Sequence, residues 1–275
     1  METMKQIMYG VTDFARIRAE NGYFVDRTAL IRELEKTSYA MFLRPRRFGK
    51  SLLCSILQCY YDIDYAGRFE EFFGGLDIGR EPTAERGKYL FIDFNFTGVE
   101  KRIDRVQDSF NEYCSERLDV FVERQAGRLP EGTTAAVLAK RTCHEKFNTL
   151  TMRLKGSGLA LYITIDEYDN FTNTILAESR ESYEALCHGD GFFKQFFNEL
   201  KLATTGTDAP VTRLFVTGVT PVTMDDVTSG FNIAANISLN PAFAALTGFT
   251  HGDVRAMLAY YRAHAGFAFD EAAVF

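Results

Sequence analysis

Four short apolar runs, each of the length of one buried strand, alternate along this chain with segments of helical periodicity. The runs are rich in aromatic and β-branched residues and cover 38–43, 89–94, 159–165 and 214–217. Strands that alternate with helices build a mostly parallel sheet between helical layers. The pattern therefore predicts an α/β fold, and a fifth short strand is expected around Ile237.

A segment with helical periodicity follows the first apolar run directly. Its apolar side chains recur at three- and four-residue spacings, which predicts a helix over 51–62: Leu52, Leu53, Ile56, Leu57, Tyr60 and Tyr61. Longer helices are expected over 99–123 and 133–155, and another over 192–200. The elements thus follow each other in the order of a layered α/β domain.

Composition and charge exclude several classes of protein. No apolar run approaches the roughly 20 residues that span a bilayer, and the first residues lead into no signal-peptide core, so a cytoplasmic protein without membrane contact is expected. The five cysteines are odd in number and form no C-x-x-C pair, which favours reduced thiols. A net charge of −6 argues against a protein that coats nucleic acid, so nucleic acid is expected only as an indirect partner.

A dense cluster of cations separates the first strand from its helix. The chain there reads Arg44, Pro45, Arg46, Arg47, Phe48, Gly49, Lys50, Ser51 and Leu52. A solvated charged turn is the alternative, but apolar segments flank the cluster on both sides. Four cations within seven residues of an acidic chain therefore indicate an anionic ligand.

The end of this segment matches the phosphate loop G-x-x-x-x-G-K-[ST] between a strand and a helix. Backbone N–H groups at a helix N-terminus bind phosphate, and the helix dipole favours negative charge there. Gly49 permits close approach of the backbone, Lys50 reaches the β- and γ-phosphates, and Ser51 binds Mg²⁺. Arg44 stands where the general pattern has its first glycine. The prediction is a site for ATP and Mg²⁺ that involves residues 44–52.

The third apolar run ends in two carboxylates, Asp166 and Glu167. Asp166 is expected to hold Mg²⁺, and Glu167 is expected to act as general base on the attacking water. Two surface carboxylates at a strand end are the alternative, which the upstream phosphate loop makes less favourable. Asp169 and Asn170 are interpreted as loop or helix-start residues.

The fourth apolar run ends at Thr217, for which two interpretations stay open. Its hydroxyl either orients the lytic water or contacts the γ-phosphate, or it is an ordinary strand hydroxyl with a satisfied hydrogen bond. For the extra arginines, we expect at least one of Arg46 and Arg47 to point away from the phosphates toward a carboxylate of a neighbouring element or subunit. Anchoring of both to the domain's own acidic residues is the alternative.

The C-terminal residues predict a separate element. Thr250 and Asp253 have the spacing of a helix N-cap and its N3 carboxylate, which predicts a helix through Tyr261. We expect an ATPase core over 1–247 and the start of a helical lid or C-terminal region over 248–275. Because the chain ends in apolar sequence, a truncated fragment is expected.

Five sequence segments together resemble those of the AAA-ATPase-like family. They are 23–28 (YFVDRT), 44–51 (RPRRFGKS), 165–169 (IDEYD), 215–221 (FVTGVTP) and 248–250 (GFT). They occur in the family's order over nearly the whole chain, and the loop with its arginines is close to a family signature. The departure at Arg44 is therefore from the general phosphate loop and not from this family.

The resemblance implies a P-loop fold of the ASCE type with a five-stranded core. Family members commonly carry a C-terminal nuclease-like domain of the PD-(D/E)XK superfamily, for which this chain has no room. The leading hypothesis is an ATP-hydrolysing switch or regulator of an attached or partner effector. A nucleotide-binding scaffold that does not hydrolyse ATP is the alternative, and a small-molecule kinase ranks below both.

Overall fold

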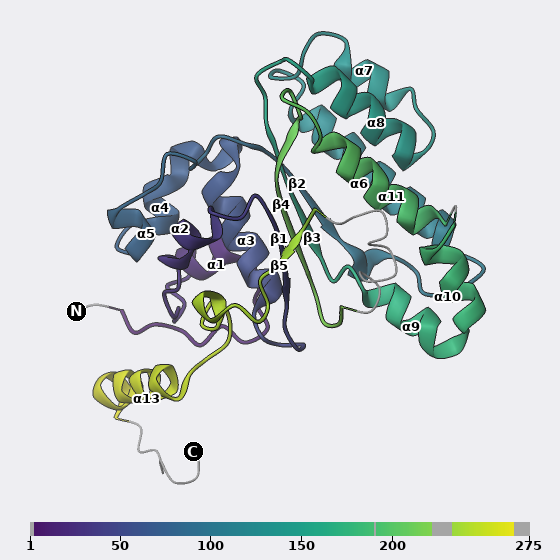
Figure 1. Ribbon diagram of the computed structural model, residues 1–275. Helices are drawn as coiled ribbons and strands as arrows, with labels where there is room; N and C mark the ends of the chain where they lie inside the picture. Colours follow the sequence, from purple (N-terminus) through teal and green to yellow (C-terminus); the bar gives the residue numbers. More distant parts are fainter. Residues whose placement is uncertain (1–2, 190, 222–232, 267–275) are drawn as a thin grey trace.

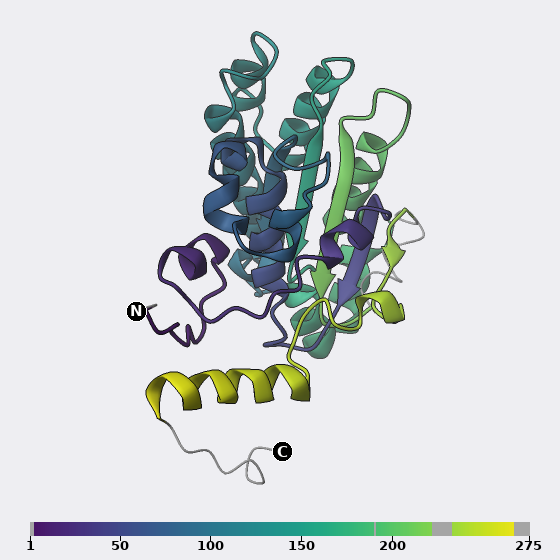
Figure 2. The same cartoon turned by 90° about the vertical axis from the view of Figure 1, so that its left-hand side faces the viewer.

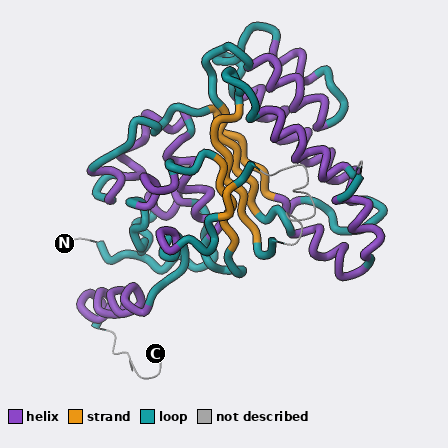
Figure 3. Tube along the Cα trace, viewed as in Figure 1, coloured by secondary structure: helices purple, strands orange, loops and turns teal. Residues whose placement is uncertain are grey.

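The computed structural model describes residues 3–189, 191–221 and 233–266. Its centre is a five-stranded sheet in the order β2-β3-β4-β1-β5, in which every pair of neighbours is parallel. Figure 3 shows these strands side by side between two helical regions. The strands are β1 (Tyr39–Leu43), β2 (Leu90–Asn95), β3 (Leu161–Asp166), β4 (Val211–Gly218) and β5 (Ala235–Asn236). The predicted α/β fold with five strands is confirmed.

The helices form two layers, one on each face of the sheet (Figure 1). One layer contains α1 (Phe14–Ala19), α2 (Leu30–Leu34), α3 (Lys50–Tyr61), α4 (Phe69–Phe73) and α5 (Asp77–Arg80). The other contains α6 (Val106–Arg124), α7 (Thr133–Leu138), α8 (Cys143–Leu154), α9 (Asn170–Glu178), α10 (Arg180–Cys187) and α11 (Phe192–Ala203). Three short 3₁₀ segments, η1 (Ile63–Arg68), η2 (Phe96–Gly98) and η3 (Pro241–Phe243), connect elements.

Both faces of the sheet are buried because successive strand residues point to opposite layers. In β1, Ala40 and Phe42 belong to the apolar cluster around α3, whereas Met41 and Leu43 belong to the cluster under α6, α8 and α11. This explains why the strands read as continuous apolar runs. The fourth strand is longer than predicted because it begins at Val211, where the polar Thr212 and Arg213 interrupt the apolar pattern.

Two helix predictions were wrong in their extent. The helix expected over 99–123 begins only at Val106, after a 3₁₀ turn and a loop of exposed, ion-paired residues. The helix expected over 133–155 is two helices, α7 and α8. The second starts at a capping box, in which Thr142 accepts a hydrogen bond from the Glu145 amide and Glu145 accepts one from the Thr142 amide. Such a T-x-x-E sequence was readable as a helix start.

The C-terminal helix α13 (His251–Ala265) lies beyond the carboxyl ends of the strands, beside the N-terminal segment (Figure 2). Its predicted capping box is present, because Asp253 accepts from the Thr250 amide at 2.7 Å and Thr250 accepts from the Asp253 amide at 3.2 Å. Lys5 fastens the N-terminal segment to α13, since its amide donates to Tyr260 and its carbonyl accepts from Tyr261. Within the described ranges, no helix is both long and apolar enough to cross a bilayer.

Candidate active site

The loop after β1 and the ends of β3 and β4 meet at one edge of the sheet. Leu43 pairs with Gly218 across β1 and β4, and Asn95 pairs with Asp166 across β2 and β3. Ligands of parallel α/β sheets bind at this edge, outside the carboxyl ends of the strands. The structure therefore brings the cation-rich loop next to the acid pair, as the sequence pattern predicted.

The backbone of the loop has two residues in the left-handed region. Arg47 has φ 68° and Gly49 has φ 86°, and Gly49 is the N-cap of α3. A left-handed conformation costs glycine little but strains arginine. No side chain caps the N-terminus of α3. The first amide groups of this helix are therefore left for a ligand, and phosphate is the anion that such termini bind.

Lys50 is buried beside this helix start. It is 4% exposed, and its ammonium donates to the Pro45 carbonyl at 3.3 Å. The same Nζ lies 3.3 Å from Oε1 of Glu167. Burial of a lysine is costly unless the charge is paired, and here the Glu167 carboxylate pairs with the ammonium.

Glu167 follows β3 directly and has φ 53°, a left-handed conformation that is uncommon for a glutamate. This turn directs the side chain to Lys50 while Asp166 stays at the end of the strand. Its side chain is 19% exposed, so the carboxylate remains open to water. Strained backbone of this kind occurs most often at functional sites.

Ser51 and Asp166 are in direct contact. The Ser51 hydroxyl donates to Oδ2 of Asp166 at 2.5 Å, and Asn95 Nδ2 donates to the same oxygen at 3.1 Å. This contact of Asn95 was not predicted from the sequence. Asn95 is a single polar residue after the second apolar run, and its place at the carboxyl end of a predicted strand could have indicated a role in the site.

Asp166 carries an unsatisfied oxygen. It is 1% exposed, and its Oδ1 has no hydrogen-bond partner among the described residues. Burial raises the pKa of this carboxyl to about 6, and the charges of Glu167 and Asp93 add to the rise while the bond from Ser51 opposes it. A buried carboxylate oxygen without a partner next to a serine hydroxyl fits the oxygen ligands that Mg²⁺ prefers.

Arg44 points away from the phosphate loop. Its guanidinium donates to the carbonyls of Leu43, Ser238 and Phe243, and it lies 4.3 Å from the ring centroid of Phe42. These contacts tie the loop to the segment after β5. The expectation that this side chain surrounds the nucleotide is therefore not supported by the geometry, because its donors serve the protein backbone.

Arg46 and Arg47 are exposed, and neither pairs with a carboxylate in the described part of the chain. Anchoring to the domain's own acidic residues thus has no support among those residues. A contact with a neighbouring subunit stays a prediction. Pro45 and Phe48 are exposed on the same loop, and Phe48 is 44% exposed.

The end of β4 is held by its own hydrogen bonds. The Thr217 hydroxyl is fully buried and donates to the Phe42 carbonyl at 2.6 Å, which favours the interpretation as a satisfied strand hydroxyl. Asp169 is fully buried and accepts from the amides of Val219 and Thr220. A Cβ on Gly218 would lie 2.4 Å from the Asp169 carboxylate, so only glycine fits there. Asp169 is therefore a structural residue, as interpreted from its place in the sequence.

An apolar cavity of about 540 Å³ adjoins the phosphate loop. The loop contributes Arg47, Phe48 and Gly49 to its wall, and Leu52 of α3 lies in the same wall. Further walls come from residues 7–12, 23–25 and Arg27, and from 246–249 and Met257 in the C-terminal part. Segments from the two ends of the described chain thus close a cavity beside the uncapped helix.

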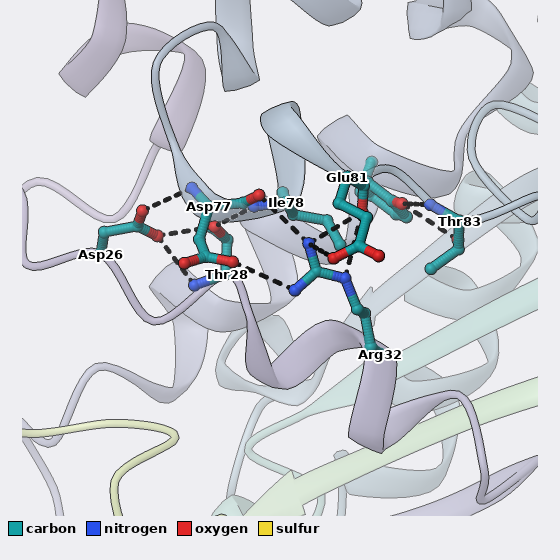
Figure 4. Close-up of polar contacts among 8 residues, drawn as sticks. Asp26, Thr28, Arg32, Asp77, Ile78, Glu81 and Thr83 are labelled. Carbon is teal, nitrogen blue, oxygen red and sulfur yellow. Dashed lines mark hydrogen bonds and ion pairs between the residues drawn. The ribbon is translucent and has the colours of Figure 1, made fainter.

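The segment 23–28 fixes these walls through contacts on both sides. Asp26 accepts from the amides of Thr28 and Asp77, and Thr28 donates to the same carboxylate, which joins the segment to α5 (Figure 4). Arg32 of α2 adds bonds to Asp77 and to the Glu81 carbonyl. These contacts explain how a segment far upstream of the phosphate loop belongs to the same site.

Arg27 connects the segment to the C-terminal helix by an ion pair with Asp253, the same residue that closes the capping box of α13. The ring of Tyr23 lies 5.6 Å from that of Tyr260 and 5.7 Å from that of Tyr261. The cavity wall is therefore continuous from the N-terminal segment to α13.

Comparison with known proteins assigns the chain to a family. Residues 8–228 match the family model described as Predicted AAA-ATPase. A protein of Azotobacter chroococcum mcd 1, described as an uncharacterized protein in the vnfD 5' region, is 26% identical over 264 residues. That alignment covers 93% of this chain and 45% of the relative, so the chain spans less than half of that protein's length. No solved structure matches significantly. Since the family model covers most of the chain, the protein belongs to the AAA-ATPase-like family of predicted AAA-ATPases.

Proposed function

We propose that this chain binds Mg²⁺–ATP at residues 44–52 and hydrolyses it to ADP and phosphate. The observation that carries the proposal is the uncapped N-terminus of α3 with the buried Lys50 ammonium beside it. An uncapped helix start and a buried cation together form a site for phosphate. Family membership supports the same ligand.

The roles of the side chains follow from their contacts. Lys50 leaves Glu167 and binds the β- and γ-phosphates together with the loop amides. Bound Mg²⁺ would neutralise charge on the phosphate oxygens, with Ser51 and Asp166 as the residues that hold it. Glu167, released from Lys50, accepts a proton from the water that attacks the γ-phosphate.

The apolar cavity is proposed to hold the base and ribose. It lies against the loop that would bind the phosphates, and its volume of about 540 Å³ suits a small ligand. Aromatic side chains such as Tyr23, Phe24 and Phe249 line it and offer surfaces on which a base can stack. The buried hydroxyl of Thr247 lines the cavity without a hydrogen-bond partner in the described residues, which leaves it for a ligand.

Substitution of Lys50 by alanine tests the site. Loss of a charge-assisted hydrogen bond should cost about 1.5–3 kcal/mol of ATP affinity, or about 10- to 150-fold in Kd by titration calorimetry. Lys36→Ala is the matched control, because Lys36 is exposed and its ion pair in the described residues is with Glu33. Equal ATP affinity in the Lys50→Ala variant and the parent would overturn the assignment.

We further propose that nucleotide state is transmitted through the expected region 248–275, of which 267–275 lie outside the described residues, and that α13 acts as a helical lid on the core 1–247. Phe249 and Met257 of this region share the cavity with Arg47 and Phe48 of the loop, so a ligand there contacts both. The effector would be an attached or partner nuclease-like domain, of the kind that the family resemblance implies. Amide hydrogen exchange in α13 should be slower with ATP than with ADP, and equal protection by the two nucleotides would count against the lid.

A further inference from the structure

Arg27 has a buried donor without a partner. The residue lines the cavity of about 540 Å³ beside the phosphate loop. Its Nη2 donates to Oδ2 of Asp253 near the start of α13, but its Nε is buried and has no hydrogen-bond partner among the described residues. An arginine side chain contains donors only, so this nitrogen needs an acceptor. A ligand of the cavity can supply that acceptor.

Thr247 carries a second unsatisfied polar group in the same cavity. It lines the cavity, and its hydroxyl is buried without a hydrogen-bond partner in the part of the chain that the structure describes. Arg27 and Thr247 belong to segments that lie far apart in the sequence and meet at this cavity. Two unsatisfied groups in the walls of one cavity favour a common ligand over two unrelated defects.

The wall that contains Thr247 packs directly on the phosphate loop. A Cβ built on Gly49 would lie 4.0 Å from the Thr247 Cβ, and a Cβ built on Gly248 would lie 3.2 Å from the ring of Phe48. A ligand whose phosphates bind the first amides of α3 can therefore extend into the cavity. The part of a nucleotide that reaches Arg27 and Thr247 is then its base.

The side chains around the cavity offer donors more than acceptors. The described residues that line it include Arg27 and Arg47, and none of them is an aspartate, glutamate, asparagine or glutamine. Guanine has N–H donors on its ring and its amino group that need acceptors, whereas the free ring nitrogens of adenine all accept. The cavity therefore suits a base whose ring nitrogens accept hydrogen bonds.

We propose that Arg27 determines the base specificity of the site, because its Nε–H donates to a ring nitrogen of adenine while the Thr247 hydroxyl makes a second hydrogen bond to the same base. This inference rests on the proposed function and adds the residues that recognise the base. A base without an acceptor at that position leaves the buried Nε unsatisfied, which costs binding free energy.

The surroundings of Arg27 hold it in place for this role. Its neighbours Asp26 and Thr28 both accept hydrogen bonds from backbone amides of α5 (Figure 4). The ion pair with Asp253 fixes the guanidinium at its other end. Because the flanking backbone and the guanidinium are both bound, little side-chain entropy is lost when a base contacts Nε.

Deaza analogues of ATP test the contact in the unaltered protein. Replacement of N1, N3 or N7 of adenine by C–H removes one acceptor at a time and keeps the phosphates. One of the three analogues should bind at least about tenfold more weakly than ATP by titration calorimetry, because it leaves the Nε–H without a partner. Parent affinity for all three analogues would overturn the proposal.

Arg27→Lys assigns the sensitive ring nitrogen to Arg27. Lysine keeps a cation for Asp253 but has no Nε, so ATP should bind about tenfold more weakly and the sensitive analogue should lose nothing further. Arg18→Lys is the matched control, since Arg18 also has a buried Nε without a partner among the described residues and donates to the Gly74 carbonyl, but does not line the cavity. Its affinity for ATP should equal that of the parent. Equal losses in the two variants, or the parent's analogue penalty in Arg27→Lys, would contradict the proposal.

Thr247→Val tests the second hydrogen bond. It removes the hydroxyl at nearly constant volume and should weaken the binding of ATP and of adenosine. Parent affinity for both would show that Thr247 does not bind the base.

Tripolyphosphate and adenosine distinguish this inference from the proposed function. Tripolyphosphate has no base, so the parent and Arg27→Lys should bind it equally, which also shows that the phosphate loop of the variant is folded. Weaker tripolyphosphate binding in Arg27→Lys would place Arg27 at the phosphates and overturn the base contact. A parent that binds adenosine in an Arg27-dependent way but not tripolyphosphate would refute the phosphate site and leave the base contact standing.

Discussion

The two edges of the sheet differ in whether their carboxyl groups have hydrogen-bond partners. At the amino edge, Glu35 accepts hydrogen bonds from Tyr61 at 3.0 Å and from Thr83 at 2.7 Å, and its carbonyl accepts from Arg213. At the carboxyl edge, Asp166 keeps an oxygen without a partner among the described residues. Glu35, which precedes β1, is thus hydrogen-bonded by neighbouring side chains, whereas Asp166 at the end of β3 keeps an unsatisfied oxygen.

We interpret this difference as a division of roles, in which the amino edge stabilises the fold and the carboxyl edge binds a ligand. Aromatic packing strengthens the amino edge, where the Tyr61 and Tyr162 rings stack at 4.7 Å. The carboxyl edge instead holds a buried lysine, and residues with left-handed backbone at Arg47 and Glu167. Such features cost stability and persist where a ligand uses them. Substitutions at the carboxyl edge should therefore alter activity, and those at the amino edge should alter folding.

The largest expected effect is at Glu167. Glu167→Gln keeps the side chain's shape but removes the proton acceptor, so ATP turnover should fall by about 10²- to 10⁴-fold. ATP affinity should be retained or increase, because Lys50 loses its 3.3 Å ion-pair partner and is free for phosphate. Steady-state phosphate release and titration calorimetry measure the two effects.

Glu178→Gln serves as the control, since Glu178 is exposed on α9. It should leave both turnover and affinity at the parent values. Turnover at the parent rate in Glu167→Gln would show that another group is the base. Asp169 is not that group, because its carboxylate is fully buried and bound to the amides of Val219 and Thr220.

A smaller effect is expected at the amino edge. Arg213→Met keeps the aliphatic stem but loses the donors to the Glu35 carbonyl and to Tyr89. The free energy of unfolding in urea should fall by about 1.5–3 kcal/mol, the scale of hydrogen bonds from a charged group. Arg16→Met removes an exposed ion pair with Glu20 and should leave the free energy of unfolding close to that of the parent.

ATP affinity should be unchanged in Arg213→Met, measured where the variant is folded. A loss of affinity as large as that of Lys50→Ala would contradict the division between the edges. So would an unfolding free energy equal to that of the parent.

The sequence predicted the sheet and the phosphate loop because local pattern determines both. The strands β1 to β4 are buried on both faces and read as apolar runs, and Gly49 with Lys50 comes shortly after the first run. Side-chain direction was less predictable. The four cations of the loop look alike in sequence, yet Arg44 donates to backbone carbonyls from the chain around residues 238–243, while Lys50 is buried beside Glu167.

The parts that could not be predicted depend on contacts between distant segments. The cavity joins residues 7–12 to residues 246–249, and no periodicity in either segment indicates that they meet. Likewise, the bond from Asn95 to Asp166 depends on the strand register, which places these two residues opposite each other. The break between α7 and α8 was missed for a different reason, since its capping box was present in the sequence.

Asp62 tests this comparison, because it is an unsatisfied carboxylate at the amino edge and not at the carboxyl edge. It ends α3 near Tyr89 at the amino side, is fully buried, and has an Oδ2 without a hydrogen-bond partner among the described residues. Burial raises its pKa to about 6, as it does for Asp166 at the other end of the sheet. Arg124 lies 3.6 Å from Oδ2 and only partly offsets the burial. Asp62 does not line the cavity beside the phosphate loop and lies at the opposite edge of the sheet, so its charge should be a cost without a ligand.

Replacement of this carboxylate should therefore stabilise the protein at neutral pH. Between the ordinary pKa of 3.8 and about 6, the folded state of the parent binds more protons than the unfolded state, so its stability falls as pH rises through this window. Asp62→Asn keeps the oxygen that accepts from the Asp64 amide but has no charge to bury. A shift of about two pKa units corresponds to at most about 3 kcal/mol, and we expect a gain of about 1–2 kcal/mol at pH 8 that shrinks toward pH 4. Urea unfolding at both pH values measures this gain in stability.

Asp64→Asn is the control. It removes ion pairs to Arg124 and Arg128 and should give no gain at pH 8. If Asp62→Asn is less stable than the parent at pH 8, the Arg124 ion pair outweighs the burial, and the amino edge contains no uncompensated charge.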